Sequence, residues 1–335
     1  MLVLRTARLD DLPGIEPLAT RSPAGVTTLP ANRDSLYRRV QASIDSLAAE
    51  VAFHGEESYL FVLEDTDTKA LVGISGIVAS AGFKEPFYSY RNETFIHASP
   101  GLGIHNKIHA LSLCHDLTGN TLLTSFYINE PLRFTQWSDL LSRARLLFIA
   151  QWPERFADGV VSEMLGVTRE DGGSEFWDAV GRRFFGIEYQ QAEFYCGVRG
   201  RKFIAELMPH HPLYVPLLND DAQEVMGQVG PYSALAYDIL MREGFETENY
   251  IDIFDGGPTL YAPVRGIRTM MESQLAKAQA GEGSRTPCLV ATTRLDDFRA
   301  CVADVAFEAG QAYMPADVLN ALALQPGDTV RFAPL

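Results

Sequence analysis

The stretch Glu243–Leu260, EGFETENYIDIFDGGPTL, gives the clearest structural signal in the chain. An amphipathic helix is predicted to end within Leu240–Phe245, because Gly244 provides the conformational freedom that commonly closes a helix. Asn249–Phe254 then alternates apolar and polar residues, which predicts a strand. Residues 255–258, Asp-Gly-Gly-Pro, favour a tight turn. The stretch therefore predicts a helix, a strand and a turn in close succession.

The rest of the chain predicts a mixture of helices and strands. Strands are expected over Met1–Arg5, Tyr59–Glu64, Leu71–Ala79, Leu122–Ile128, Val160–Gly166 and Ile187–Tyr195, and helices over Leu9–Ala19, Asn32–Phe53, Asp139–Gln151 and Phe176–Phe185. Residues 179–194 align with residues 239–254 without a gap, and each segment is predicted to be a helix, then a Phe, then a strand. Either a faint internal repeat or chance explains this similarity. Residues 271–286 read as a helix end and a loop. A small α/β appendage follows, with strands Cys288–Thr293 and Thr329–Phe332 and a helix Pro315–Leu324.

The bulk properties exclude several classes of protein. A length of 335 residues predicts more than one domain. The net charge of −15 argues against nucleic-acid binding, which needs a basic face. No apolar run approaches the roughly 18 residues of a membrane span, and the N-terminus lacks signal-peptide features, so a cytoplasmic protein without membrane contact is expected. The four cysteines form no CxxC pair, which predicts neither a zinc site nor a disulfide framework.

Several longer motifs point to one family. They are GVTTLP at 25–30, YLFVLED at 59–65, NETFIHAS at 92–99, HNKIHALSLCHDLTGNTLLTSFY at 105–127 and FIAELMP at 203–209, together with the stretch quoted first. In this order and spacing the sequence resembles the arginine N-succinyltransferases of bacterial arginine catabolism, and most closely the alpha chain of their two-subunit form. The resemblance implies an α/β (α+β) chain with the acyl-CoA N-acyltransferase (GNAT-like) fold. The expected division is a GNAT-like domain at 1–200, a reduced second GNAT-like half at 201–265, and a small C-terminal module at 266–335.

The resemblance also implies a reaction and its partners. Such an enzyme transfers succinyl from succinyl-CoA, a co-substrate, to the α-amine of L-arginine or L-ornithine, and it needs no permanently bound cofactor. The acyl donor is expected along the strand that contains Phe126 and Tyr127, followed by Arg133 as the first residue of a pyrophosphate loop. A paralogous beta subunit or a homo-oligomer is the expected protein partner.

Two positions depart from the family pattern. The pyrophosphate loop R-x-x-G-x-G/A has Gln136 and Ser138 in place of its glycines, with Trp137 between them. The motif G-Q-V-H-P, whose histidine is the family's proposed proton donor, reads Gly-Gln-Val-Gly-Pro at 227–231. Because Gly230 has no titratable group, the chain is either an active subunit that uses another proton donor or a non-catalytic partner subunit.

Other residues are candidates for the missing chemistry. His211 is the candidate proton donor, because it aligns with a histidine of the single-chain relatives. Glu206, Asp252 and Asp255 are the acidic residues considered for binding the cationic substrate, since carboxylates pair with guanidinium and ammonium groups, and Glu206 and Asp252 are the candidates retained. Asp255 is also consistent with the first residue of a Gly-Gly turn, and Asp252 with a solvent-facing strand residue. His105 and His109 are four residues apart, and could share one face of a helix, but without a third ligand no metal site is expected.

Overall fold

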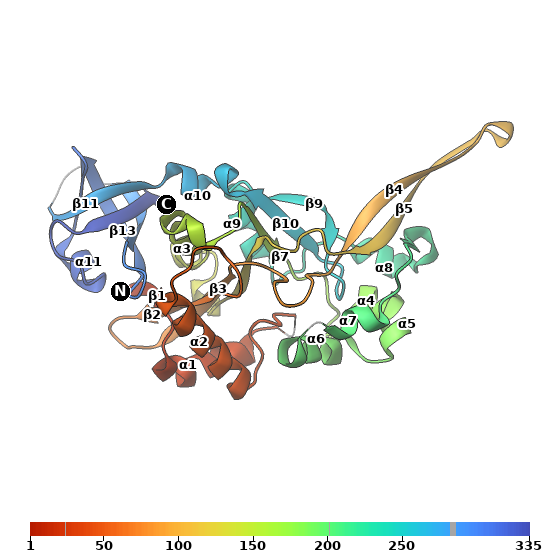
Figure 1. Ribbon diagram of the computed structural model, residues 1–335, viewed down its shortest axis with the longest axis horizontal. Coiled ribbons are helices and arrows are strands. Elements are labelled where there is room, and N and C mark those ends of the chain that lie inside the picture. The colour runs from red at the N-terminus through yellow and green to blue at the C-terminus, as the bar shows by residue number, and fades with distance from the viewer. Residues whose placement is uncertain (24, 201, 282–285) are drawn as a thin grey trace.

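The computed structural model describes residues 1–23, 25–200, 202–281 and 286–335 (Figure 1). The N-terminal core is a twisted sheet with helices on it. Its strands are β1 (Leu2–Thr6), β2 (Ser58–Asp65), β3 (Leu71–Val78), β6 (Thr121–Ile128), β7 (Gly159–Glu163), β10 (Pro258–Pro263) and β9 (Glu246–Ile251), in that spatial order. All neighbours are antiparallel except β6 and β7, which are parallel. The helices are α1 (Leu12–Arg21), α2 (Arg33–Ala48), α3 (Gln136–Gln151) and α9 (Ala234–Arg242).

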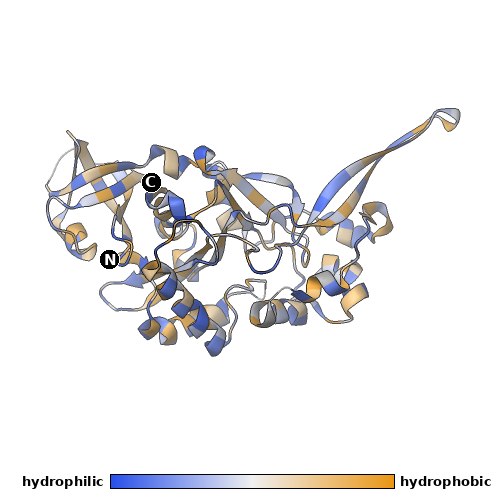
Figure 2. Ribbon diagram, viewed as in Figure 1, coloured by the Kyte–Doolittle hydropathy of each residue, from blue (hydrophilic) through white to orange (hydrophobic). Residues whose placement is uncertain are grey.

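This arrangement confirms the GNAT-like element order expected from the sequence. Helix α2 begins where the Asn32 side chain accepts a hydrogen bond from the Ser35 N–H, and buries Leu36 and Val40 against β2. Helix α3 is buried along most of its length, with Phe148 between aromatic rings of the sheet and of the C-terminal part. Figure 2 shows both hydrophobic and hydrophilic residues around α1 and α2, as expected of helices with one face on a sheet.

The two parallel strands at the centre of the sheet diverge. Only Thr121 and Leu122 of β6 are paired with β7, and no further ladder pair joins the two strands in the described residues. Ser125 of β6 has a left-handed backbone, with a φ of 56°, and the pairing of β6 with β3 shifts register beside it. A bulge of this kind bends a strand. The bend in β6 opens a wedge between β6 and β7.

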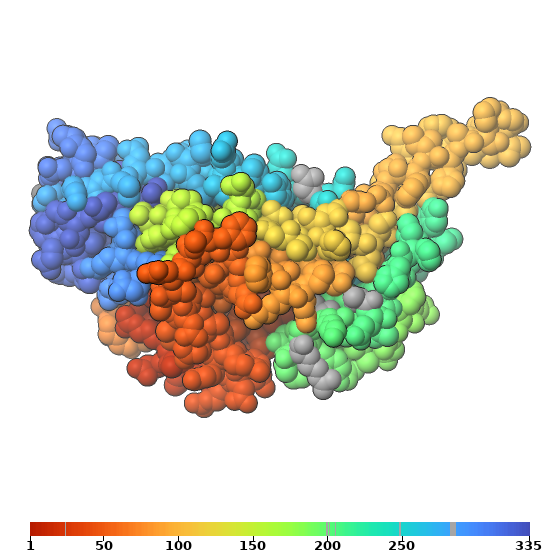
Figure 3. Space-filling view, viewed as in Figure 1, coloured from red at the N-terminus to blue at the C-terminus, as the bar shows by residue number. Residues whose placement is uncertain are grey.

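Short helices and a long hairpin lie beyond β7. The helices are α4 (Glu175–Ala179), α5 (Gly181–Phe185), α6 (Tyr189–Arg199), α7 (Lys202–Leu207) and α8 (Asp220–Val225), and several of them pack around the buried Trp177. Strands β4 (Ser89–Ser99) and β5 (Ile104–Cys114) pair along their whole length, and β8 (Leu213–Tyr214) adds two residues at the edge of β5. The far half of this hairpin, residues 94–109, projects from the body as an arm (Figures 1 and 3).

The C-terminal part is a small closed sheet. After α10 (Arg268–Glu272) come β11 (Gln274–Ala280), β12 (Thr286–Thr292), β13 (Arg299–Glu308), β14 (Gln311–Met314), α11 (Ala316–Ala321) and β15 (Thr329–Pro334). The order β12-β15-β11-β14-β13, with β12 also paired to β13, closes a five-stranded ring. Strand β13 also pairs with β1, so the ring continues the N-terminal sheet.

Two local predictions were wrong. Residues 187–195 were expected to form a strand, but most of them form helix α6, because Tyr189, Ala192 and Cys196 recur at helical spacing and are buried together. The aligned segments 179–194 and 239–254 therefore do not share an element order. The expected loop at 271–286 contains β11, whose buried residues are the small Ala276 and Ala278; residues 282–285 lie outside the described part.

The two histidines that could have shared a helical face lie on the hairpin. His105 and His109 are both on strand β5. Among the described residues no group of three metal-ligating side chains is found. No helix in the described part of the chain is long and apolar enough to cross a membrane.

Candidate active site

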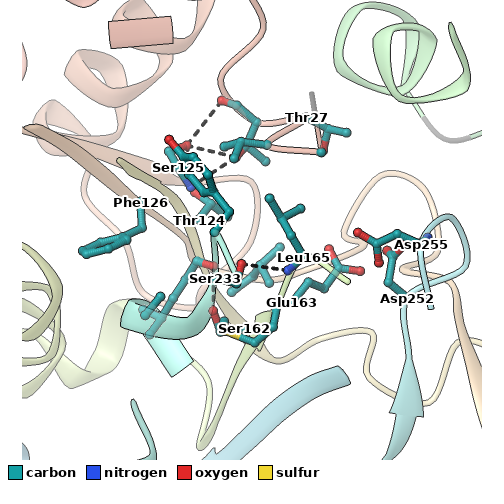
Figure 4. Close-up of a pocket in the computed structure, with 18 of the residues that line it drawn as sticks. Thr27, Thr124, Ser125, Phe126, Ser162, Glu163, Leu165, Ser233, Asp252 and Asp255 are labelled. Carbon is teal, nitrogen blue, oxygen red and sulfur yellow. Dashed lines mark hydrogen bonds between the residues drawn. The ribbon is translucent and has the colours of Figure 1, made fainter. Parts of the chain in front are cut away.

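A pocket of about 100 Å³ lies in the wedge between β6 and β7 (Figure 4). Its walls come from the two strands, the N-terminal loop at 25–28, the start of α9, and the turn after β9. The lining includes Thr28, Thr124, Ser125, Phe126, Arg145, Ser162, Glu163, Leu165, Glu193, Tyr232, Ser233, Asp252 and Asp255. Segments from across the whole N-terminal core therefore meet at the place where the sheet opens.

One end of the pocket is built around the bulge at Ser125. The Ser125 N–H donates to the Thr28 hydroxyl at 3.2 Å, and the two hydroxyl oxygens are 3.0 Å apart. Arg39 of α2 donates from Nη2 to the Ser125 hydroxyl at 3.1 Å. The family motif at 25–30 thus has a structural role: it caps the bulged strand.

The other end of the pocket is acidic. Figure 4 shows Asp252, Asp255 and Glu163 together, away from Ser125, and Glu193 also lines the cavity. Asp255 is 2% exposed and accepts hydrogen bonds from the Gly166 and Gly257 N–H groups, both at 2.8 Å. Burial, and then the neighbouring charge of Asp252, raise the pKa of Asp255 to about 8, although the two N–H groups lower it.

Asp252 has a different environment. Its Oδ1 accepts from the N–H groups of Phe254 and Asp255 at 2.7 and 3.0 Å, so one oxygen closes the turn after β9. Strand β9 ends at Ile251, earlier than the predicted strand, and Asp252 consequently leaves the strand pattern and lines the pocket. A carboxylate held by one oxygen keeps the other for a ligand.

Gly230 is fixed by its contacts with the end of β7. Its N–H donates to the Leu165 carbonyl at 2.8 Å, and the Ser233 hydroxyl accepts from the Leu165 N–H at 2.9 Å. A Cβ at position 230 would collide with the carbonyl oxygen of Gly166. The backbone at this point is therefore packed for glycine, and a histidine requires the chain to move.

The loop that aligns with a pyrophosphate loop is a capped helix start. Thr135 is the N-cap of α3, and its hydroxyl accepts from the Trp137 N–H at 3.3 Å. Phe134 has a φ of 59°, whereas Gln136 and Ser138 have ordinary helical conformations, so neither position uses a glycine-like backbone. Arg133 donates to the Tyr232 carbonyl at 3.2 Å, and its guanidinium carbon lies 5.0 Å from the centre of the Tyr232 ring.

The predicted site residues fall into two groups. Phe126 and Asp252 line the pocket, and Arg133 touches Tyr232, which also lines it. Tyr127 is buried under α1 and α2, because it points to the other face of β6. Glu206 and His211 are exposed, on α7 and just after it, and neither lines the pocket.

Several pocket residues were missed by sequence reasoning. Glu163 and Glu193 belong to the acidic end, and Tyr232 supplies a phenol whose pKa burial raises to about 12. Asp255 had two interpretations, an acidic site residue and a turn residue, and it both lines the pocket and closes the turn; its burial is not visible in the sequence. Tyr232 follows directly after the GQVGP motif, and that position was the available signal.

The comparisons with known proteins agree along the entire chain. The family profile described as arginine N-succinyltransferase beta subunit matches residues 2–269, and the profile of its C-terminal domain matches residues 272–334. Arginine N-succinyltransferase subunit alpha of Pseudomonas aeruginosa is 55% identical over 334 residues, covering 99% of both chains. Arginine N-succinyltransferase of Escherichia coli is 38% identical over 338 residues, covering 100% of this chain and 98% of that protein. The solved structure of arginine/ornithine succinyltransferase subunit AI from Pseudomonas aeruginosa matches with a TM-score of 0.92 at 53% identity, over 100% of this chain and 98% of that one.

Proposed function

The chain belongs to the arginine N-succinyltransferase family, and from this premise we propose that it transfers the succinyl group of succinyl-CoA to the α-amine of L-arginine or L-ornithine. The family resemblance predicted from the sequence is confirmed. Full-length relatives named as transferases favour an acyltransferase over a partner that only stabilises another chain. The observation that carries the substrate proposal is the acidic end of the pocket, since a cationic amino acid needs carboxylates around it.

The acceptor amine is the first half of the proposed chemistry. Asp252 and Glu163 pair with the cationic groups of the amino acid, and Asp255 takes a proton from the attacking amine. The pKa of Asp255, about 8, suits this step, because a base with a pKa near the working pH combines availability with basicity. The amine nitrogen attacks the thioester carbon, the amide bond forms, and the carbon–sulfur bond breaks.

The acyl donor is the second half. We place the pantetheine arm along the open edge of β6, near Phe126, where pairing with β7 has ended. The leaving thiolate takes a proton, for which Tyr232 is the proposed donor: it lines the pocket, and its raised pKa keeps it protonated. His211, the donor predicted from the sequence, and Glu206, a predicted substrate ligand, are alternatives that mutagenesis separates from Tyr232 and Asp252.

The projecting arm supports the proposal of a second subunit. Residues that face each other across the hairpin share a side, so Phe95 and Ile108 form one face with Tyr214, while His105, Lys107 and His109 belong to the other. The stretch Thr94–His109 has no acidic residue, although the whole chain contains 43 of them. An exposed two-stranded hairpin is only marginally stable alone. We propose that it docks on the acidic surface of a second chain of this family, either a paralogous beta subunit or another copy.

The expected cytoplasmic location and the absence of a permanently bound cofactor also remain predictions.

The test is thiol release from succinyl-CoA by the purified chain, with L-arginine or L-ornithine as the acceptor. The account predicts turnover and formation of the Nα-succinyl product, identified by mass spectrometry. The measurement is repeated with a paralogous chain added, because activity only in the pair assigns catalysis to that chain. Folded protein without turnover in either arrangement contradicts the proposal.

A further inference from the structure

Two arginines lie beside the bulged strand β6, Arg145 buried and Arg39 half-buried, and their environments differ. Arg145 of α3 donates from Nε to the Ser142 carbonyl and from Nη2 to the Ser142 hydroxyl, both at 3.0 Å. Its Nη1 lies 3.4 Å from the Thr124 carbonyl, and its guanidinium carbon lies 5.6 Å from the centre of the Phe126 ring. The donors of Arg145 are therefore engaged by the protein, and we assign it a structural role.

Arg39 has no such set of partners. Among the described residues its Nη2 donates a hydrogen bond to the Ser125 hydroxyl, and its Nε is a buried donor without a partner there. No carboxylate of the described residues lies within ion-pair distance of it. Burial lowers its pKa to about 10, without a compensating acidic neighbour, so Arg39 is still charged at pH 7. A buried donor such as this Nε–H is costly to leave without a hydrogen bond, and such donors are normally paired.

The position of Arg39 suggests the missing counter-ion. It is one hydrogen bond away from Ser125, which lines the pocket with Thr28. Figure 4 shows Ser125 at one end of the pocket and Asp252 and Asp255 at the other. The pocket thus has carboxylates at one end and, at the other, the Ser125 hydroxyl, behind which the guanidinium of Arg39 is hydrogen-bonded.

We propose that Arg39, with Ser125, forms the subsite that binds the terminal carboxylate of the succinyl group. The inference rests on the proposed function, because succinyl differs from an uncharged acyl group of the same length only by this carboxylate. A guanidinium binds a carboxylate through charge-assisted, often bidentate, hydrogen bonds. The α-carboxylate of the amino acid has the same chemistry, so the experiment must separate the two sources.

The variants are Arg39→Gln and Arg39→Lys, with Arg38→Gln as the control. Arg38 is the exposed neighbour on the same helix, and among the described residues it donates to the Ser35 hydroxyl. For each protein, kcat/KM is measured with succinyl-CoA and with butyryl-CoA, which replaces the terminal carboxylate by a methyl group. A second pair of acceptors compares L-arginine with agmatine, which lacks the α-carboxylate.

Arg39→Gln is expected to reduce the preference for succinyl-CoA over butyryl-CoA by about 100-fold, the scale of losing a charged hydrogen-bond partner. Arg39→Lys is expected to keep part of the preference, Arg38→Gln all of it, and the ratio of arginine to agmatine should not change. Equal losses with both acyl donors, or a loss that follows arginine against agmatine, would overturn the assignment. Calorimetry compares the binding of the two acyl-CoAs to the same variants without turnover. If the wild type is inactive, the proposed function is contradicted, but the binding preference still tests the subsite.

Discussion

Gly230 offers the sharpest test of why the family's histidine is absent. The Gly230 N–H bonds to the Leu165 carbonyl at 2.8 Å, and a Cβ would meet the Gly166 carbonyl oxygen, which is backbone and cannot rotate away. Forcing a side chain into packed structure costs about 1–3 kcal/mol, and losing a buried hydrogen bond costs about 1–3 kcal/mol more. Gly230→Ala and Gly230→His should therefore lower the free energy of unfolding by about 2–6 kcal/mol.

Urea unfolding measures this difference through the midpoint, provided that the slope is unchanged. Gly101→Ala is the matched control, because a Cβ at Gly101 meets nothing within 4 Å. The control should unfold with the wild type, whereas both Gly230 variants should unfold at lower urea and Gly230→His should not increase succinyl transfer. A Gly230→His protein as stable as the wild type, or more active, would refute the reasoning.

Three further predictions follow from the same contacts. The kcat/KM of the wild type should rise with pH to a plateau above about 8, because Asp255 must lose its proton to act as a base. In Asp252→Asn this rise should move to lower pH, since the charge of Asp252 raises the pKa of Asp255. A pH profile that does not move would contradict the role of the pair. Glu243→Ala should destabilise the protein by about 3–5 kcal/mol in urea unfolding, because it leaves the buried Arg143 without the carboxylate to which it is paired at 2.8 Å. A change below about 1 kcal/mol would argue against that cost. Replacing residues 94–109 by a short turn should leave a folded chain whose mass by light scattering is that of one subunit. An unchanged assembly mass would show that the arm does not form the interface.

The sequence predicted the scaffold better than the site. Strands β2, β3 and β6 and helices α2 and α3 follow from periodicity, because each buries one regular face or is wholly buried. Helix α6 and strand β11 were missed, since their buried positions are decided by Trp177 and by the closed C-terminal ring, which are long-range partners.

The pocket depends on contacts that no local pattern contains. Thr28 meets Ser125 across 97 positions, and Asp255 reaches the Gly166 N–H across 89. Asp252 was a candidate by residue type, but its place in the pocket comes from the early end of β9. The unpaired state of Arg39 is likewise a property of packing, because exposed arginines on the same helix look identical in sequence.

The most direct test of the account is the steady-state kinetics of Asp252→Asn with L-arginine and succinyl-CoA varied separately. The substitution keeps Oδ1, which closes the turn, and removes the charge that the account assigns to the acceptor. The account predicts a KM for L-arginine raised about 10-fold or more, with the KM for succinyl-CoA unchanged and no fall in the unfolding midpoint. An unchanged KM for L-arginine, or an equal rise for both substrates, would contradict the claim that the acidic end of this pocket binds the amino acid.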